Sequence, residues 1–189
     1  MSDQFWSSAG LEPKRKFRWL LYFAGAPKFI IKSVTKPSFQ IGSTSHQFLQ
    51  HTFNFPGRVT WQDISLTLVD PVDPDAAQTL YNMLQAFGYE LPTNILTSAT
   101  GMKTISKNDM VTTLGEFKIQ QISANSNTEI LEEWILKNPQ ITSVSFDGLD
   151  YTSDEALNIT VGIKYDWATL NELATEPKTS WNFNNRSDT

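Results

Sequence analysis

The feature that most constrains the fold of this chain is a strict alternation of apolar and polar residues between Leu157 and Trp167. Successive side chains of a β-strand point to opposite faces, so this pattern predicts one long strand with a buried face and a face toward water or a lumen. The residues expected in the core are Ile159, Val161, Ile163, Tyr165 and, from another alternating segment, Leu66. Those expected to face solvent or a lumen are Asn158, Thr160 and Lys164.

Shorter strand patterns precede this segment. Period-two runs and β-rich stretches predict strands at residues 45–55, 60–70, 114–122, 129–136 and 144–146. Near the amino end, residues 17–23 and 29–31 flank Gly25-Ala26-Pro27 and predict a hairpin. Pro56-Gly57-Arg58 predicts a turn between two of the strands, and Asn138-Pro139 predicts a break.

One segment has a helical pattern. Asp73 is the expected N-cap, Pro74 suits the first helical position, and Gly88 is the expected stop, which predicts a helix over about 74–87. Residues 90–109 are expected to form a long loop. Strands on both sides of a single internal helix favour a mainly β protein, an antiparallel β-sandwich or barrel.

The chain of 189 residues fits one compact domain with peripheral arms. The polar ends predict an N-terminal arm over 1–16 and a C-terminal arm over 171–189, around a β domain at 17–170. The start of the chain has no basic segment typical of a signal peptide, and the longest apolar run, residues 19–26, is far shorter than the roughly 20 residues of a membrane span. We therefore expect no membrane-spanning segment.

The ionisable residues argue against several function classes. Lys and Arg number 15 against 20 for Asp and Glu, so tight binding of nucleic acid through phosphates is disfavoured. No cysteine is present, which excludes thiolate metal sites, cysteine nucleophiles and disulfides. His46 and His51 are expected on one strand with opposite orientations, so they would not share a metal ion.

The sequence contains no motif of a known catalytic site. It has no nucleophile elbow, P-loop, dinucleotide fingerprint or zinc-protease motif, so we predict no enzyme, no catalytic residue and no cofactor. Asp70, Asp73 and Asp75 could hold a cation, but helix capping explains them better, and no metal site is predicted.

Two stretches carry a family resemblance. Residues 55–70 read FPGRVTWQDISLTLVD and precede an aspartate-rich turn and an amphipathic helix. Residues 134–147 read WILKNPQITSVSFD and precede the alternating strand, which ends in Lys164-Tyr165-Asp166-Trp167. In content and order, roughly from Phe17 to Ala168, these elements resemble the tail tube proteins of contractile-tailed bacteriophages.

The resemblance implies a structural virion protein. In that family, hexameric rings pool their sheets into a β-barrel and stack into the inner tube of the tail, inside a sheath and between a baseplate and a terminator. Such a tube would be assembled in the host cytoplasm and would carry genomic DNA into the host without binding it tightly. Closure into a ring would also remove exposed sheet edges.

Other functions stay open. A tube subunit of a bacterial contractile injection or type VI secretion apparatus has the same architecture, and a baseplate tube initiator or terminator would explain the long arms. A different class is a glycan-binding β-sandwich module that uses exposed aromatic residues. The arms contain isolated aromatic residues, which we expect to contact neighbouring subunits: Phe5, Trp6, Trp181 and Phe183.

Overall fold

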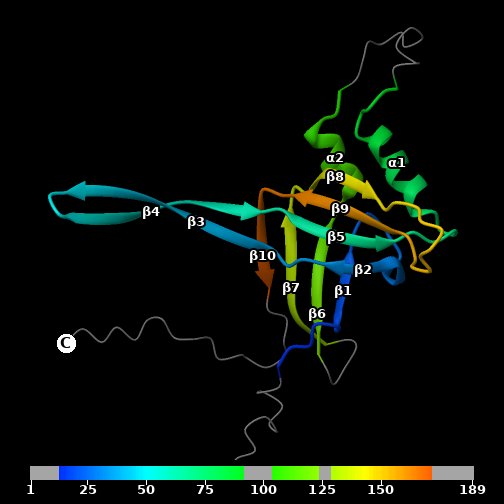
Figure 1. The fold of residues 1–189 in the computed structure, drawn as a ribbon, viewed down its shortest axis with the longest axis horizontal. Helices are drawn as coiled ribbons and strands as arrows, with labels where there is room; N and C mark the ends of the chain where they lie inside the picture. Colours follow the sequence, from blue (N-terminus) through cyan, green and yellow to red (C-terminus); the bar gives the residue numbers. More distant parts are fainter. Residues whose placement is uncertain (1–12, 92–103, 124–128, 172–189) are drawn as a thin grey trace, which may run out of the picture.

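Two four-stranded antiparallel sheets and one long two-stranded ribbon make up the β-structure (Figure 1). The computed structural model describes residues 13–91, 104–123 and 129–171. Sheet A has the strand order β1 (Trp19–Tyr22), β6 (Phe117–Ile122), β7 (Ile130–Lys137) and β10 (Trp167–Asn171). Sheet B has the order β2 (Ile31–Val34), β5 (Ile64–Val69), β9 (Asn158–Lys164) and β8 (Gln140–Phe146). The ribbon consists of β3 (Ser38–Phe48) and β4 (His51–Gln62).

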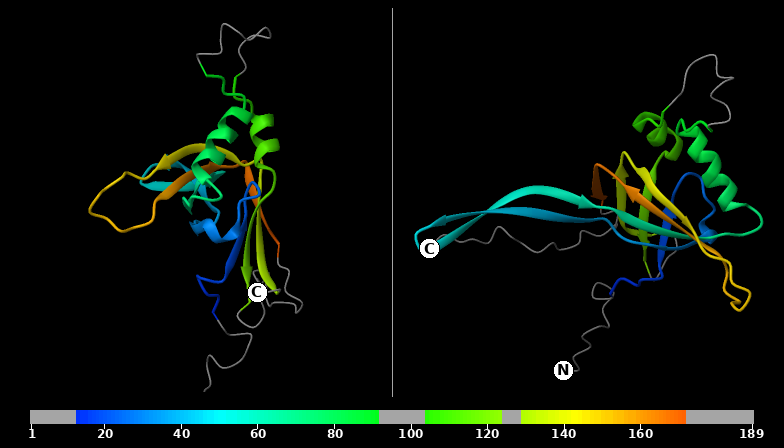
Figure 2. Two further views of the ribbon diagram at one scale, coloured as in Figure 1. Left: turned by 90° about the vertical axis from the view of Figure 1, so that its right-hand side faces the viewer. Right: turned by 45° about the horizontal axis from the view of Figure 1, so that its top comes forward.

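The strands of sheet A run across those of sheet B, and the two sheets form a sandwich (Figure 1). Side chains from both sheets meet in a single apolar core. Two helices, α1 (Ala76–Ala86) and α2 (Lys107–Leu114), lie together at one end of the sandwich (Figures 1 and 2). The largest fully buried side chains are Phe117, Leu21, Leu66, Ile119, Ile159, Ile163 and Val161.

Sheet B confirms the burial predicted from the alternation. Leu66 and Val161 are cross-strand partners with 0% exposure, and Val34 and Val144 continue their row to both edges of the sheet. Thr160 and Lys164, between the buried positions of β9, are exposed, and Asn158 is half-buried. Burial of one face and hydration of the other therefore fix the register of this sheet.

The expected single strand over 157–167 is two strands. β9 belongs to sheet B, β10 belongs to sheet A, and the chain changes sheet at Tyr165 and Asp166. Leu157 and Trp167, at the two ends of the alternation, are 40% and 47% exposed rather than buried. The local period of two continues through the crossing, so the sequence pattern carries no sign of it.

The amino-terminal hairpin prediction was wrong. β1 pairs with β6 and β2 pairs with β5, so the two segments lie in different sheets. Ala24 and Gly25 both adopt positive φ angles, 46° and 73°, and a short 3-10 helix at Lys28–Ile30 follows them. This connection leads the chain from one sheet to the other.

The predicted turn at Pro56-Gly57-Arg58 lies inside β4, and the chain turns instead at Leu49 and Gln50. At Pro56-Gly57-Arg58 the register shifts, because β4 has one extra residue between the pairs Ile41–Val59 and Ser43–Pro56. A Cβ atom on Gly57 would lie 3.2 Å from the backbone of Gly42. The glycine therefore permits a β-bulge with close backbone approach, the other structure that such a residue favours.

The helix prediction was correct in place and wrong in detail. α1 begins after Asp75, whose side-chain oxygen accepts a hydrogen bond from the Gln78 backbone N at 2.8 Å. Asp70 accepts a second one from Ala77 N at 3.3 Å. Asp75 is therefore the N-cap in place of Asp73. Asp70 and Asp75 both accept hydrogen bonds from backbone N–H groups in the first turn of the helix and so stabilise it.

The expectation of one internal helix was also wrong. α2 occupies part of the predicted loop over 90–109, with Ser106 as its N-cap, and Leu114, expected at the start of a strand, ends this helix. Its low apolar content hides it from periodicity analysis. The predicted strands at 129–136 and 144–146 and the break at Asn138-Pro139 are confirmed, and Asn138 adopts a φ of 54°.

The fold class is thus the predicted mainly β antiparallel sandwich, with two helices, and its sheets do not close into a barrel. Parts of the predicted loop and both predicted arms lie outside the described residues. No helix within the described ranges is long and apolar enough to cross a membrane.

Replacing Val161 by aspartate tests which alternate residues of sheet B face the core. Val161 has no exposed surface, so the substitution would bury an unpaired charge at a cost of several kcal/mol, against a stability of about 5 to 15 kcal/mol. We expect Val161→Asp to abolish soluble folding. The control is Thr160→Asp on the opposite face, which should fold and melt normally by circular dichroism. A soluble Val161→Asp protein with an unchanged melting temperature would contradict the assignment.

Candidate assembly surfaces

The β3–β4 ribbon extends far from the sandwich (Figure 1). Its base is anchored by aromatic contacts, because Trp61 lies between Phe39, at a ring centroid distance of 5.5 Å, and Tyr165, at 5.9 Å. Beyond this anchor, every residue of β3 is exposed, and so is every residue of β4 except Trp61. Since an isolated two-stranded ribbon is marginally stable in water, its exposed length favours a role in contact with another molecule.

Apolar side chains line one face of the ribbon in each half, and the face changes at the bulge. In the half near the sandwich, Phe39 pairs with Trp61 and Ile41 with Val59. In the outer half, the apolar residues lie on the opposite face and are each more than half exposed: Phe48, Phe53 and Phe55. The strands cross over between base and tip, so the ribbon is twisted along its length (Figure 1).

The two histidines lie on the outer face of the ribbon, which is the face of its outer half that holds Phe48, Phe53 and Phe55. His46 lies on β3 opposite Phe53, and His51 lies on β4 opposite Phe48, so the register places both imidazoles on the same face of the ribbon. The sequence-based placement on one strand with opposite orientations was wrong, because the chain turns between them at Leu49 and Gln50. Both side chains are exposed.

The outward face of sheet B is lined with hydroxyl groups. Ser33, Thr67, Thr160 and Ser145 are successive cross-strand partners and form a row across all four strands. A second row consists of Ser65, Gly162 and Ser143. A Cβ atom on Gly162 would contact the Ser143 hydroxyl oxygen, so a larger residue here would require the Ser143 side chain to change its rotamer.

The charged groups on this face are sparse. Lys32 donates a hydrogen bond from Nζ to the Asn158 Oδ1 atom at 2.9 Å, and Lys164 lies at the far end of β9. The surface is thus neutral and polar, with isolated cations. It presents no array of Lys and Arg suited to phosphate binding.

Both sheets end in strands that pair on one side only among the described residues. These are β1 and β10 in sheet A, and β2 and β8 in sheet B. Strands of this kind present backbone N–H and C=O groups that can pair with another chain.

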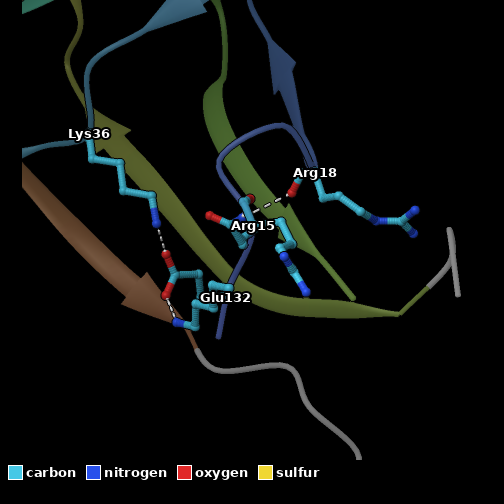
Figure 3. Close-up of polar contacts among 6 residues, drawn as sticks. Arg15, Arg18, Lys36 and Glu132 are labelled. Atoms are coloured by element: carbon cyan, nitrogen blue, oxygen red, sulfur yellow. Dashed lines mark hydrogen bonds and ion pairs between the residues drawn. The ribbon is translucent and has the colours of Figure 1, made fainter. Parts of the chain in front are cut away.

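The open end of the sandwich holds a buried acidic group, Glu132 of β7 (Figure 3). Lys14, from the segment before β1, and Lys36, from the connection into β3, both donate to its carboxylate. Beside it, the Gln121 side chain donates to the Arg15 and Arg18 backbone oxygens at 2.6 and 3.0 Å. These contacts join the N-terminal segment and the base of the ribbon to sheet A.

The electrostatics at Glu132 favour its ionised form. Burial raises the pKa of this carboxyl, but the hydrogen bonds and positive charges of Lys14 and Lys36 outweigh that effect and hold the pKa below its usual range. The ion pairs are therefore present at neutral pH.

Polar contacts hold the segment in which the chain passes from sheet B to sheet A. Lys107 and Asn138 each donate to the Asp166 Oδ2 atom at 2.7 Å, and these bonds hold the pKa of Asp166 below its usual range. The Asp166 backbone N also donates to the Lys137 oxygen at 3.0 Å. The acidic end of the alternating segment thus connects α2, β7 and β10.

The residues predicted to contact neighbouring subunits, Phe5, Trp6, Trp181 and Phe183, lie outside the described residues and stay predictions. Sequence reasoning missed the ribbon because Pro56-Gly57-Arg58 is a stronger turn signal than Leu49-Gln50. A usable signal was the absence of any carboxylate from Ser38 to Gln62, which is unusual for so long a polar segment.

Comparison with solved structures identifies the fold. No family model and no curated protein matches the sequence. A chain of the sheath–tube complex of the extracellular contractile injection system PVC, in its extended state, matches with a TM-score of 0.62 and 16% identity, covering 91% of this chain and 98% of that one. A chain of the tube-terminating cap of the anti-feeding prophage matches with a TM-score of 0.62 and 17% identity, covering 91% and 99%.

A third match is a chain of the anti-feeding prophage baseplate, with a TM-score of 0.57 and 14% identity, covering 85% of this chain and 97% of that one. At these identities the likeness concerns the fold. The chain therefore has the tail tube-like fold that the sequence resemblance implied, over most of its length.

Glu132→Gln tests the buried ion pairs. Loss of the charge should weaken both lysine contacts and lower the free energy of unfolding by about 1 to 2 kcal/mol at pH 7. Because the folded-state pKa is lowered, the stabilisation is complete above the ordinary glutamate pKa of about 4.3 and is lost as pH falls through the lower value. Urea unfolding at several pH values measures the difference.

The control for this experiment is Glu116→Gln, because the Glu116 side chain is 60% exposed and its ion pair with Lys118 contributes little. A Glu132→Gln protein as stable as the parent protein at pH 7 would show that the buried pairs do not stabilise the fold.

Proposed function

We propose that this chain is a structural subunit of the inner tube of a contractile tail or injection particle, which forms hexameric rings that stack end to end. The observation that carries the proposal is the tail tube-like fold with its exposed ribbon and singly paired strands. Cyclic contacts between such strands build a ring, and contacts between the ends of rings build a tube.

The hydroxyl face of sheet B is the proposed wall of the lumen. A conduit needs a surface that does not retain its cargo, and phosphate contacts from Lys and Arg would hold DNA. Ser33, Thr67, Thr160 and Ser145 present neutral groups across the whole sheet. This composition supports passage of genomic DNA, as in ejection from a phage into its host. We propose no catalytic role for it.

The second candidate is a tube subunit of an extracellular injection particle. It is favoured by the solved structures with a similar fold, which come from PVC and the anti-feeding prophage. A tube initiator or terminator is a variant of either candidate, since one of these structures is a tube-terminating cap. Sheath, baseplate and terminator proteins are the proposed partners in each case, and the proposed location is the assembled particle.

The terminal arms, 1–16 and 171–189, are proposed as contacts between subunits. Their aromatic residues would anchor on neighbouring copies, with Phe5 and Trp6 at one end and Trp181 and Phe183 at the other. The glycan-binding module is a weaker alternative, because the exposed rings on the ribbon follow the period of the strands and no described cavity gathers several of them.

Native mass spectrometry and negative-stain microscopy of the purified chain test the proposal. We expect a six-subunit species at high protein concentration, and rings with a central hole or tubes in micrographs. A protein that remains monomeric, alone and in the presence of baseplate proteins, would contradict the tube function. Binding to oligosaccharides by such a monomer would support the module.

The lumen assignment is tested by adding cations to the hydroxyl row. The double variant Thr67→Arg/Thr160→Arg should form rings that bind labelled duplex DNA, with an affinity that falls steeply as salt increases, because each new phosphate contact releases counterions. The parent rings should show no appreciable binding at physiological salt. Fluorescence anisotropy across a salt series measures both.

The control is Gln78→Arg on the exposed face of α1, which should leave binding unchanged. Strong, salt-dependent DNA binding by the parent rings would exclude a passive wall. Equal binding by the double variant and the α1 control would exclude this face as the wall.

A further inference from the structure

A groove lined by cations runs along one edge of the sandwich, between β1 of sheet A and β2 of sheet B. Its two adjoining parts have volumes of about 470 and 570 Å³ and share Lys16, Trp19 and Lys32. Apolar side chains of both strands line it as well, and Phe17 at its border is 77% exposed. The cationic residues that line it are Lys14, Arg15, Lys16, Lys28, Lys32 and Lys36.

The charge along this edge has one sign. Seven of the 15 Lys and Arg residues of the chain lie from Lys14 to Lys36, and no carboxylate occurs between Pro13 and Gln62. Lys14 and Lys36 donate to the buried carboxylate of Glu132. The groove therefore suits an occupant that combines carboxylates with apolar groups.

Three lysines of the groove are exposed: Lys16, Lys28 and Lys32. Two of them are positioned by contacts within the chain. The Lys28 Nζ atom lies 4.4 Å from the ring centroid of Tyr22, and the Lys32 Nζ atom donates to Asn158 Oδ1 at 2.9 Å. These contacts are on the protein surface, so a carboxylate of another molecule can approach both ammonium groups.

The loop between β8 and β9, residues 147–157, has the required combination and projects from the sandwich (Figure 2). Leu149 is 87% exposed, and Tyr151 is fully exposed. The loop contains four carboxylates and no Lys, Arg or His: Asp147, Asp150, Asp154 and Glu155.

Two of these carboxylates shape the loop. Asp147 Oδ2 accepts from the Asn158 backbone N at 3.2 Å and from its side chain at 3.0 Å. Asp150 Oδ1 accepts from the Thr152 backbone N and hydroxyl, both at 2.9 Å. Asp154 and Glu155 are exposed on the same loop and are the carboxylates best placed for an external partner.

The topology of sheet B relates the loop to the groove. β2 and β8 are the two edge strands of this sheet, so the groove and the loop lie at opposite edges and contact requires a second copy. All neighbouring strands of the sheet are antiparallel, so β2 and β8 run in opposite directions. A β8 strand placed beside β2 of another copy would therefore continue the antiparallel pattern.

The register shows which ends would meet. Ile31, Leu68, Ile159 and Phe146 are successive cross-strand partners, so the start of β2 and the end of β8 lie at the same end of the sheet. In an edge-to-edge arrangement, the loop after Phe146 thus lies beside the residues before Ile31, which include Lys28. Such pairing extends the sheet in its own plane, and repetition with a constant rotation closes a ring.

We propose that the 147–157 loop of one copy docks in the cationic groove between β1 and β2 of its neighbour in the same ring. Asp154 and Glu155 would face Lys28 and Lys32, and Leu149 and Tyr151 would pack on the apolar lining. This inference rests on the proposed tube function and adds a charged contact to the pairing of strands.

Charge exchange tests the contact. Lys28→Glu/Lys32→Glu should place carboxylates opposite carboxylates and raise the protein concentration for half-maximal ring assembly about tenfold or more. Asp154→Lys/Glu155→Lys should have a similar effect, because lysines then face lysines. Combining the two pairs should restore assembly toward the parent level. Native mass spectrometry across a concentration series measures the six-subunit species.

The control is Gln78→Glu/Gln85→Glu on the exposed face of α1, which adds negative charge away from the groove. It should leave the assembly concentration nearly unchanged. Circular dichroism establishes that every variant folds. The loop variant changes exposed residues alone, so it tests the contact independently of packing in the groove.

Carbodiimide cross-linking locates the contact, because this reagent joins a lysine to a carboxylate only when the two groups are in contact. Rings assembled from a mixture of isotopically labelled and unlabelled protein distinguish links between copies from links within one copy. We expect mixed-isotope links between the 147–157 loop and Lys28 or Lys32 in isolated rings, before any stacking.

The outcomes separate the two levels of the proposal. Unchanged ring assembly in the Lys→Glu variant, no restoration in the combined variant, or loop links that form only in stacked tubes would overturn the docking contact and leave the tube function intact. A parent protein that forms no rings would overturn the tube function, and the docking inference with it.

Discussion

The structure depends on the row of apolar side chains that crosses sheet B at Leu66 and Val161. These two side chains are completely buried, and the row spans the sheet from edge to edge. Because neighbouring positions on each strand point the other way, the same strands present a row of hydroxyl groups outside. One alternation therefore produces both the core of the subunit and the neutral surface proposed as the lumen wall.

Much of this could be predicted from the sequence, because period-two alternation reports directly on a half-buried sheet. The buried residues of β9, the position of α1 and the mainly β class follow from local patterns. The change of sheet at Tyr165 could not be predicted, since both strands continue the same alternation and the cause lies in tertiary contacts. Asp166 is held there by Lys107 and Asn138, which are distant in sequence.

The ribbon shows how a correct local signal can be assigned to the wrong structure. Gly57 does mark an irregularity of the backbone, but glycine is favoured both in turns and in bulges. Only the close approach of Gly42 distinguishes them, and that contact depends on strand pairing. The error also moved the histidines to opposite faces, so the surface that they share with Phe48 and Phe53 was not predicted.

Glu132 connects the N-terminal segment and the base of the ribbon to sheet A. Its two lysine partners come from the segment before β1 and from the connection into β3, so one buried carboxylate fixes the directions in which both leave the sandwich. The orientation of so long a ribbon depends on its base, because a small rotation there produces a large displacement at the tip. The aromatic contacts of Trp61 constrain the other side of that base. The base of the ribbon is thus held by ion pairs and by aromatic contacts, while the rest of its length is exposed.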